Sequence, residues 1–567
     1  MRNGLITIIT IISTSLLKRG SIVLALISMV SCVKDIPAPS PTPSPEPVIT
    51  KFALEPEIEL DPNLNSPLAA LLKYDTNTPT RAELKVVTTD YSHTINTQEY
   101  KTSHSIPVLG LRPGRDYEIN VDIFTKDSTK SSLNKILSVS TEPLPDGFPS
   151  LNVSKRIDGK VEPGFTLFDI IPEGGNAEFG ALIVIVDTYG EIVWYQIGSR
   201  YTDLRQLGNG NILFIEGTKV VEMDMLGERA NEWKAVRNPP KDRMRRYVDT
   251  GIFHHEVFPL LRGNFLSLSV ESRTFDNYPT SATDQNAPRQ TVNVVGDLVI
   301  EFRPDGSIRK QWSLLDLMDP RRIGWDTLGG YWDPFFSKKT QDWSHANAVI
   351  HSPRDNAIIV TSRHQDATIK FRRKNGELLW ILGPHENWDK KKFGKYLLKP
   401  VNNRKYFFPY HSHAPMLMPN GNILMYDNGN YRSSPPDDKL EVKDNFSRAV
   451  EYRINERKRE IELVWEYGEF IEDRIFSGAL GDADHLPIKD NILITHGNIA
   501  ADDGKLSSAI VEVTHTTPAQ EIFRLDVFDN TTNPENGWRI YRSARIADLY
   551  GAESGITISQ LKRITKK

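Results

Sequence analysis

The chain has 567 residues, of which 39% are hydrophobic and 25% charged, so it is long enough for two or more domains and a large core. Its formal net charge of −4 gives no reason to expect a nucleic-acid partner. The only cysteine is Cys32, which excludes an internal disulfide and thiol chemistry elsewhere in the chain.

Residues 1–32 predict an export signal that ends in a lipid anchor. Lys18 and Arg19 precede an apolar run that ends at Cys32, the pattern of a bacterial lipoprotein signal. A second apolar run extends from Leu5 to Leu17, so a plain signal peptide or an N-terminal anchor helix remains an alternative. The prediction is an exported protein anchored to a bacterial membrane, in the periplasm or at the cell surface. Residues 33–47 are rich in Pro and Ser and predict an extended, semi-rigid linker.

Residues 48–145 predict a small β-sandwich of the immunoglobulin or fibronectin type. Short alternating segments such as AELKVVTT and YEINVDIFT recur at regular spacing. In LRPGRDYEINV a Pro-Gly turn precedes Tyr117, which resembles the tyrosine corner of fibronectin type III domains. We expect this domain to act as a spacer or as a contact in a homodimer, without chemistry of its own.

Residues 150–567 predict a six-bladed β-propeller built from two alternating hairpins. Six outer hairpins, such as ALIVIVDTYGEIVWY, pair an apolar strand with one that ends in an aromatic residue. These aromatic residues are expected in the blade cores, and the terminal segment WRIYRSARI is expected to complete the first blade and close the ring. They are Trp194, Trp233, Trp312, Trp380, Trp465 and Phe523.

An inner hairpin recurs five times, and each copy has an Asn directly after its turn: Asn211, Asn264, Asn356, Asn422 and Asn491. Nine residues before each Asn stands a polar residue, in chain order Thr202, His255, Asn347, His413 and Asp482. A repeat that keeps its scaffold and varies one polar position indicates a ring of hairpins around a common site.

The register of these hairpins predicts which side chains share the site. His345 and Arg363 face each other across the open end of one hairpin, and Asn347 shares the strand face of His345. His364 alternates to the opposite face, so we place it outside the site. Carboxylates are sparse at these positions. The predicted cluster comprises His255, His345, Asn347, Arg363 and His413, with Thr202, His254, His411, Asp482, Thr495, His496 and Asn498 nearby.

This cluster fits recognition of a tetrahedral oxyanion, because arginine binds such groups with two parallel hydrogen bonds and neutral imidazole is a nucleophile. A metal-dependent propeller hydrolase or oxidoreductase is the main alternative, since His411 and His413 resemble a zinc or copper pair. The charge of Arg363 beside His345 disfavours a dication there, so no metal or other cofactor is expected. A non-catalytic surface binding propeller is the third possibility.

The motifs resemble those of the bacterial arylsulfate sulfotransferases, exported enzymes that use no nucleotide sulfate donor. The matching segments are HHEV at 254–257, SHANAV at 344–349 with TSR at 361–363, SHAP at 412–415 with MYDNG at 425–429, and ITHGN at 494–498. The resemblance spans the whole mature chain and implies transfer of a sulfuryl group from a phenolic sulfate to a phenol by a ping-pong mechanism.

The resemblance also implies roles for individual residues. His413 matches the histidine that becomes sulfated, and His255, His345, Asn347 and Arg363 match the sulfate-binding and acid-base residues. His254 and His411 are expected at the substrate as well, and either Ser477 or Thr495 would replace a family hydroxyl residue. We expect Phe253 and Tyr410 to pack against phenol rings. The best-known members carry a disulfide close to the site, which this chain cannot form.

Overall fold

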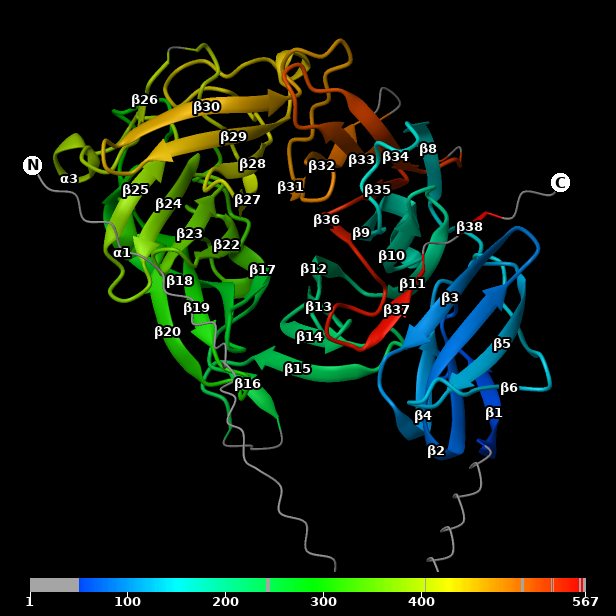
Figure 1. Cartoon of the computed structure of the whole chain (residues 1–567). Coiled ribbons are helices and arrows are strands. Elements are labelled where there is room, and N and C mark those ends of the chain that lie inside the picture. The colour runs from blue at the N-terminus through cyan, green and yellow to red at the C-terminus, as the bar shows by residue number, and fades with distance from the viewer. Residues whose placement is uncertain are drawn as a thin grey trace, which may run out of the picture. The chain divides into compact units, whose positions relative to one another are not determined.

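The computed structural model describes residues 50–563, apart from 241–244, 403, 501–503, 532, 534 and 560–561. The predicted export signal, the linker and Cys32 lie outside the described residues. Strands account for nearly all regular structure in this part of the chain, which confirms the all-β prediction (Figure 1). None of its helices has the length and apolar content needed to cross a membrane. The helices are α1 (Leu314–Leu317), α2 (Asp333–Phe336), α3 (Lys390–Phe393), η1 (Gly174–Glu178) and η2 (Val442–Asp444).

The N-terminal strands form one nine-stranded sheet, in which the 18-residue β2 pairs with β1 and β4 and also with β3 and β5. The C-terminal strands β37 and β38 pair with β3, so the end of the predicted propeller range returns to the sandwich. The strands are β1 (Phe52–Leu60), β2 (Ala70–Val87), β3 (Tyr91–Thr97), β4 (Lys101–Val108), β5 (Asp116–Phe124), β6 (Lys130–Ser132), β7 (Leu137–Ser140), β37 (Ile556–Ile558) and β38 (Lys562–Arg563).

Tyr117 forms the predicted tyrosine corner. Its buried hydroxyl accepts from the Arg112 N–H at 2.6 Å and donates to the Arg112 carbonyl at 3.2 Å. The hydroxyl of Tyr91 lies 2.9 Å away. The contact fixes the chain five residues upstream, as this corner does in related sandwiches.

The other strands form five sheets. Four of them are separate: β12 (Tyr201–Gln206) to β16 (Arg246–Val248), β17 (His254–Pro259) to β21 (Gln341–Asp342), β22 (Ala346–Ser352) to β25 (Leu378–Leu382), and β26 (Lys399–Pro400) to β30 (Glu460–Tyr467). Their remaining strands are β13 (Ile212–Glu216), β14 (Lys219–Met223), β15 (Arg229–Ala235), β18 (Phe265–Tyr278), β19 (Gln290–Phe302), β20 (Ile308–Ser313), β23 (Ala357–Ser362), β24 (Ala367–Arg372), β27 (His413–Leu417), β28 (Ile423–Asp427) and β29 (Arg448–Asn455).

The fifth sheet has ten strands and joins two of the predicted blades. Strand β35 pairs with both β9 and β33, so the six predicted blades are not six separate sheets. The strands are β8 (Ser150–Arg156), β9 (Phe165–Glu173), β10 (Ala181–Asp187), β11 (Ile192–Gly198), β31 (Asp482–Leu486), β32 (Asn491–Ala500), β33 (Leu506–Thr514), β34 (Glu521–Phe528), β35 (Gly537–Arg539) and β36 (Ser543–Ile546).

The innermost strands close a ring. Strands β12, β17, β22, β27, β31 and β36 contact one another in that order, and β36 contacts β12 (Figure 1). Strand β36 pairs with β9, which confirms that the terminal segment completes the first blade. Strand β8 supplies the outer edge of the last group by pairing with β34. Closure of this kind leaves few sheet edges free to pair with other chains.

Both predicted hairpin repeats are confirmed by the strand pairing. The turn after β10 shows why the sequence forms them. Asp187 accepts hydrogen bonds from the N–H groups of Tyr189 and Glu191, and Gly190 takes the positive φ of 80° that the turn requires. The aromatic residues that end the outer hairpins are buried as predicted, because they pack between neighbouring sheets.

Candidate active site

The inner hairpins bring the predicted polar side chains together at one end of the ring. His255 lies on β17, His345 directly precedes β22, Arg363 directly follows β23, and His413 begins β27. The Arg363 N–H donates to the His345 carbonyl at 3.2 Å, which confirms the predicted pairing across the hairpin. The ring centroids of His255 and His345 are 5.3 Å apart. These residues form one cluster.

The surroundings of His413 determine its tautomer. Its Nδ1 lies 2.6 Å from Oδ1 of Asn428 and 3.1 Å from the His411 carbonyl, and both partners are acceptors. The amide of Asn428 cannot turn around, because its Nδ2 donates to the carbonyls of Ser477 and Leu480 at 2.7 Å each. The ring proton therefore sits on Nδ1, and Nε2 keeps a free lone pair.

Burial keeps His413 neutral. Loss of solvation and the nearby Arg363 charge hold the pKa of His413 well below its ordinary value of 6.5. The side chain is only 3% exposed. A neutral imidazole with a free Nε2 is the form that attacks an electrophile.

His345 forms a unit with Asp342 and His364. Its Nδ1 hydrogen-bonds to Oδ2 of Asp342, whose Oδ1 accepts from Trp332 Nε1 at 3.1 Å. The ring of His364 stacks on that of His345 with centroids 4.6 Å apart, and its Nδ1 donates to the Asp342 carbonyl at 2.7 Å. The placement of His364 outside the site is therefore wrong. Strand β23 ends at Ser362, so strand alternation does not apply to a residue in the following turn.

His255 contacts the buried His254, which lies close to the buried carboxylate of Asp297. Its Nδ1 lies 2.8 Å from Nδ1 of His254, whose Nε2 lies 3.2 Å from Oδ1 of Asp297. Burial and the neighbouring histidines hold the pKa of His255 well below its ordinary value. His254 therefore supports His255 and lies one step further from the cluster.

Arg363 and His411 share a carboxylate. Nη1 of Arg363 lies 3.7 Å from Oδ2 of Asp326, and its Nη2 donates to the Gly478 carbonyl at 3.2 Å. His411 contacts Asp366 through Nδ1 at 2.8 Å and Asp326 through Nε2 at 3.3 Å. Because both nitrogens of His411 face carboxylates and the ring is fully buried, this residue holds Asp326 in place and does not pair with His413 around a metal.

Asn347 links two parts of the cluster. Its Nδ2 donates to the Ser412 carbonyl at 2.8 Å and so fixes the peptide that precedes His413. Its own carbonyl accepts from Nη2 of Arg542 at 3.0 Å. Its Oδ1 is buried without a hydrogen-bond partner among the described residues. Asn347 therefore positions the backbone beside His413.

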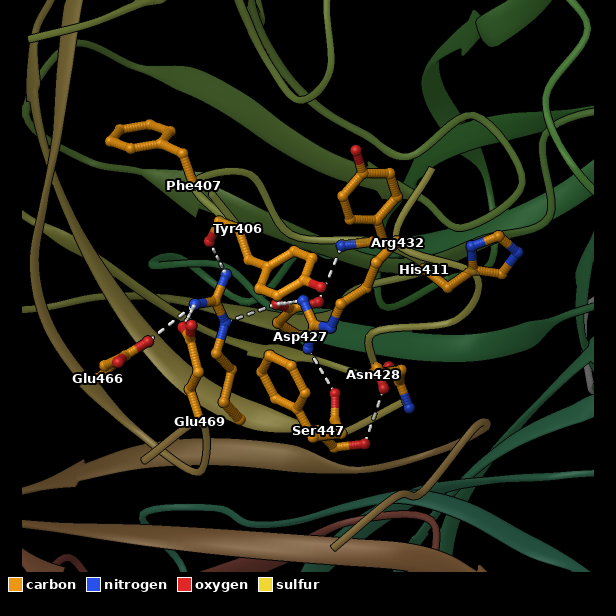
Figure 2. Close-up of polar contacts among 12 residues, drawn as sticks. Tyr406, Phe407, His411, Asp427, Asn428, Arg432, Ser447, Glu466 and Glu469 are labelled. Carbon is orange, nitrogen blue, oxygen red and sulfur yellow. Dashed lines mark hydrogen bonds and ion pairs between the residues drawn. The ribbon is translucent and has the colours of Figure 1, made fainter. Parts of the chain in front are cut away.

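A buried ionic network surrounds Asp427, the last residue of β28 (Figure 2). Oδ2 of Asp427 accepts from Nη1 of Arg432 at 2.9 Å and from Nε of Arg448 at 2.8 Å. Its Oδ1 accepts from the Tyr410 N–H at 2.8 Å. The Arg448 guanidinium also contacts Glu466 and Glu469. This network fixes the segments on both sides of His411 and Asn428.

Three further predicted residues lie in buried contacts. Oγ1 of Thr495 is 2.6 Å from Oγ of Ser543, and Oγ of Ser477 donates to the Ala479 carbonyl at 3.1 Å. The prediction that Phe253 packs against substrate is wrong, because this residue is 1% exposed and packs in a hydrophobic core with Phe302. It precedes β17 and points into the sheet interface.

Carboxylates near the cluster are more numerous than the sequence pattern predicts. Asp203 and Glu256 directly follow two of the aligned positions, and both contact Nη1 of Arg542, at 2.8 Å and 2.6 Å. Arg542 comes from the segment between β35 and β36, so its side chain could be placed only once the ring was closed. The sequence feature that could have predicted these carboxylates is the acidic residue directly after Thr202 and after His255.

A cavity of about 410 Å³ opens beside the cluster. The ring of Tyr331 borders it and stands 4.9 Å from that of His345 between centroids. Its other lining residues are Ala282, Gly324, Asp326, Leu328, Gly329, Asp342 and His364. An aromatic and apolar wall next to a group of imidazoles suits a small aromatic ligand.

Asp342, His345 and His364 also have the composition of a metal site, and their ligand atoms lie within 4.8 Å of one another. Burial and then the charges of His345 and Arg363 hold the pKa of His364 well below its ordinary value. The same Arg363 charge would oppose a dication. Since Nδ1 of both histidines already contacts Asp342, a metal would have to use the opposite nitrogens or displace these contacts.

The chain has a β-sandwich followed by a propeller-like ring, and imidazole and guanidinium groups cluster at one end of that ring. Together these features indicate an all-β enzyme. The arylsulfotransferase (ASST) family model matches residues 150–542, and the arylsulfotransferase Ig-like domain model matches residues 57–142. The chain therefore belongs to the arylsulfotransferase family.

Two curated relatives have the same name, arylsulfate sulfotransferase AssT. The protein from Lelliottia amnigena is 24% identical over 505 residues, which cover 72% of this chain and 79% of the relative. The protein from Escherichia coli O6:H1 is 24% identical over 507 residues, with the same two shares. Among solved structures, the periplasmic gluconolactonase of Pseudomonas aeruginosa overlaps 70% of this chain and 99% of its own, with 10% identity and a TM-score of 0.28.

Proposed function

We propose that this enzyme transfers a sulfuryl group from a phenolic sulfate to a phenolic acceptor through a sulfohistidine at His413. The free Nε2 of a neutral His413, fixed by Asn428, is the observation that carries the proposal. Membership of the arylsulfotransferase family supports the substrate class.

In the first half-reaction, Nε2 of His413 attacks sulfur, an N–S bond forms, and the S–O bond to the phenol breaks. Arg363 holds the sulfuryl oxygens with His345, where charge develops. In the second half-reaction, the acceptor phenol oxygen attacks sulfur and the N–S bond breaks. The phenolic proton passes to the neutral His255 and from there to solvent, and the phenolate released in the first half-reaction takes up a proton from solvent. Tyr331 packs against the phenol ring.

The test is a burst experiment with a chromogenic phenyl sulfate and no acceptor. Covalent catalysis should release phenol up to about one equivalent per site, and the protein should gain one sulfuryl group on the peptide that contains His413. His413→Ala should abolish both the burst and the adduct. An adduct on His255 or His345 instead would reverse the assigned roles while keeping the chemistry.

A metal-dependent hydrolase is the second candidate, favoured by the Asp342, His345 and His364 group. A chelator distinguishes the two candidates. A metal-dependent hydrolase should lose activity in chelator and regain it with metal, and it should release phenol continuously without an acceptor or an adduct. Chelator-resistant transfer that requires an added phenol supports the sulfotransferase.

We also propose that the protein is exported and anchored through a lipid on Cys32, as the apolar run before this cysteine indicates. Cys32→Ser should move the protein from the membrane fraction to the soluble fraction of the exported material. A variant that stays fully in the membrane fraction would assign the anchor to the upstream apolar run.

A further inference from the structure

A second histidine cluster lies at the turn ends of the last sheet. His485 is on β31, Asp490 is in the turn between β31 and β32, and His515 is in the turn between β33 and β34. Nε2 of His485 lies 2.8 Å from Oδ1 of Asp490, and Nδ1 of His515 lies 3.4 Å from the same oxygen. The proposed sulfuryl-transfer mechanism uses none of these groups.

We propose that His485, Asp490 and His515 form a zinc-binding site. Two imidazoles and one carboxylate are a common ligand set for Zn²⁺, with the fourth position left to water. Ligand atoms about 2.0–2.2 Å from zinc at tetrahedral angles stand roughly 3.3–3.5 Å from one another. The three residues offer ligand atoms within 4.8 Å of one another, so only small side-chain movements are needed.

The surroundings of His515 match those of a metal-bound histidine. Its Nε2 lies 2.6 Å from Oε2 of Glu451, on strand β29 of the neighbouring sheet. Glu451 is 2% exposed, and its Oε1 accepts from the amides of Asn420 and Asn422. A buried carboxylate that accepts a hydrogen bond from Nε2–H leaves Nδ1 available as a ligand, as metal-bound histidines usually have a carboxylate on their other nitrogen.

The ligands are open to entry from solvent. The side chain of Asp490 is 71% exposed, while those of His485 and His515 are 10% and 15% exposed. This leaves room for a water on the metal and freedom for the carboxylate to adjust.

The site would join two sheets. His485, Asp490 and His515 belong to the ten-stranded sheet, while Glu451 belongs to the sheet of His413. The turns lie at the opposite ends of the hairpins from the catalytic cluster, since His413 is at the start of β27 and Asn422 follows its turn. Zinc should therefore stabilise the fold and leave sulfuryl transfer unchanged.

Zinc binding is measured by calorimetry on untagged, chelator-treated protein. We expect one zinc to bind at this site in the unaltered chain and to be lost in the His485→Asn, His515→Asn double variant. His351→Asn, which changes a partly buried histidine near the end of β22 that is paired with Asn356, should retain it. Glu451→Gln should bind zinc about tenfold more weakly, at the lower end of the roughly 10- to 100-fold effect of losing the carboxylate that orients a metal-bound histidine.

The fluorescence of Trp465 reports metal binding without substitution of a ligand residue. Its ring centroid lies 5.2 Å from that of His515, so Cu²⁺ in the site should quench its fluorescence, and excess Zn²⁺ should reverse the quenching. Trp465→Phe should remove most of that signal. Zinc should also raise the unfolding temperature of the unaltered chain but not that of the double variant, with less than a twofold change in transfer activity.

Unchanged zinc binding in a folded double variant would overturn the proposal. Loss of zinc in His364→Asn, with retention in the double variant, would also overturn it by assigning the metal to the catalytic cluster. Failure of Cu²⁺ to quench Trp465 in the unaltered chain would do the same without any variant of a ligand.

Discussion

The two ends of the inner hairpins differ in what they repeat. At the turn end, the aligned Asn donates to a Glu on the neighbouring strand in four of the five copies, and the bond is much the same each time. The pairs are Asn211–Glu222, Asn264–Glu301, Asn422–Glu451 and Asn491–Glu512. The turn end is therefore a structural scaffold, and the repeats keep the same hydrogen bond there.

At the open end, the equivalent position varies and the strands are irregular. Register shifts follow Thr202, His254, Ala346 and His413, and the β31–β32 hairpin is regular at Asp482. Asp203, His255 and Ala414 have positive φ, which costs a non-glycine residue about 1–3 kcal/mol. A bulge turns a side chain out of the pleat, so the strain is concentrated where the chemistry lies.

The largest effect should come from the partner that fixes His413. In Asn428→Leu the acceptor for Nδ1 is lost and the proton is free to move to Nε2. We expect kcat to fall about 10²- to 10⁴-fold, as it does when an orienting partner of a catalytic histidine is replaced. Burst kinetics with a phenyl sulfate measure this.

Asn428→Asp is the control, because it keeps the acceptor while losing the donors to Ser477 and Leu480. Its negative charge favours the imidazolium, so the acidic limb of the kcat/KM profile should move to higher pH. An unchanged profile in a folded Asp variant would show that residue 428 does not control the protonation of His413.

The next effect concerns Arg363. Arg363→Lys keeps the charge but removes the planar pair of donors, so we expect about a 10²- to 10³-fold loss of kcat with the fold intact. Arg363 lies in the turn after β23, and its turn hydrogen bonds use backbone atoms that the substitution keeps. Near-normal turnover of the Lys variant would rule out two-point binding of the sulfuryl oxygens by Arg363.

The sequence predicts the scaffold end better than the catalytic end. Turn residues, strand alternation and terminal Trp residues place both hairpin repeats, because each is a local signal. The same alternation misplaces His364, which lies in a turn where strand geometry has ended. Asp326 and Asp342 come from the long segment between α1 and β22, and Arg542 from the closing segment. No local pattern places such residues, because their positions depend on tertiary contacts.

The catalytic end should also be the acid-sensitive end. The folded-state pKa values of His255 and His413 lie well below 6.5, so below pH 6.5 the unfolded chain binds more protons than the folded one. Stability is therefore full above that pH and falls as the pH drops, by about 1.4 kcal/mol per group and pH unit. Denaturant unfolding at pH 7.0 and 5.5 should show less loss in His413→Asn than in the unaltered chain.

The smallest effect should come from the scaffold end, and it should appear in stability alone. In Asn264→Ala the buried Glu301 loses one donor but keeps Arg309 and Arg373, so we expect a loss of about 1–2 kcal/mol in the free energy of unfolding. Asn356→Gly is the control, since the Asn356 side chain hydrogen-bonds only to His351 and Arg373 at the surface and glycine accepts its positive φ of 51°; it should cost less than about 0.5 kcal/mol. Denaturant titration of both variants and their kcat values test the contrast. A large fall in kcat for Asn264→Ala would mean that the two ends of the hairpin are coupled, because a purely structural bond at the turn has no route to the imidazoles other than the strand itself.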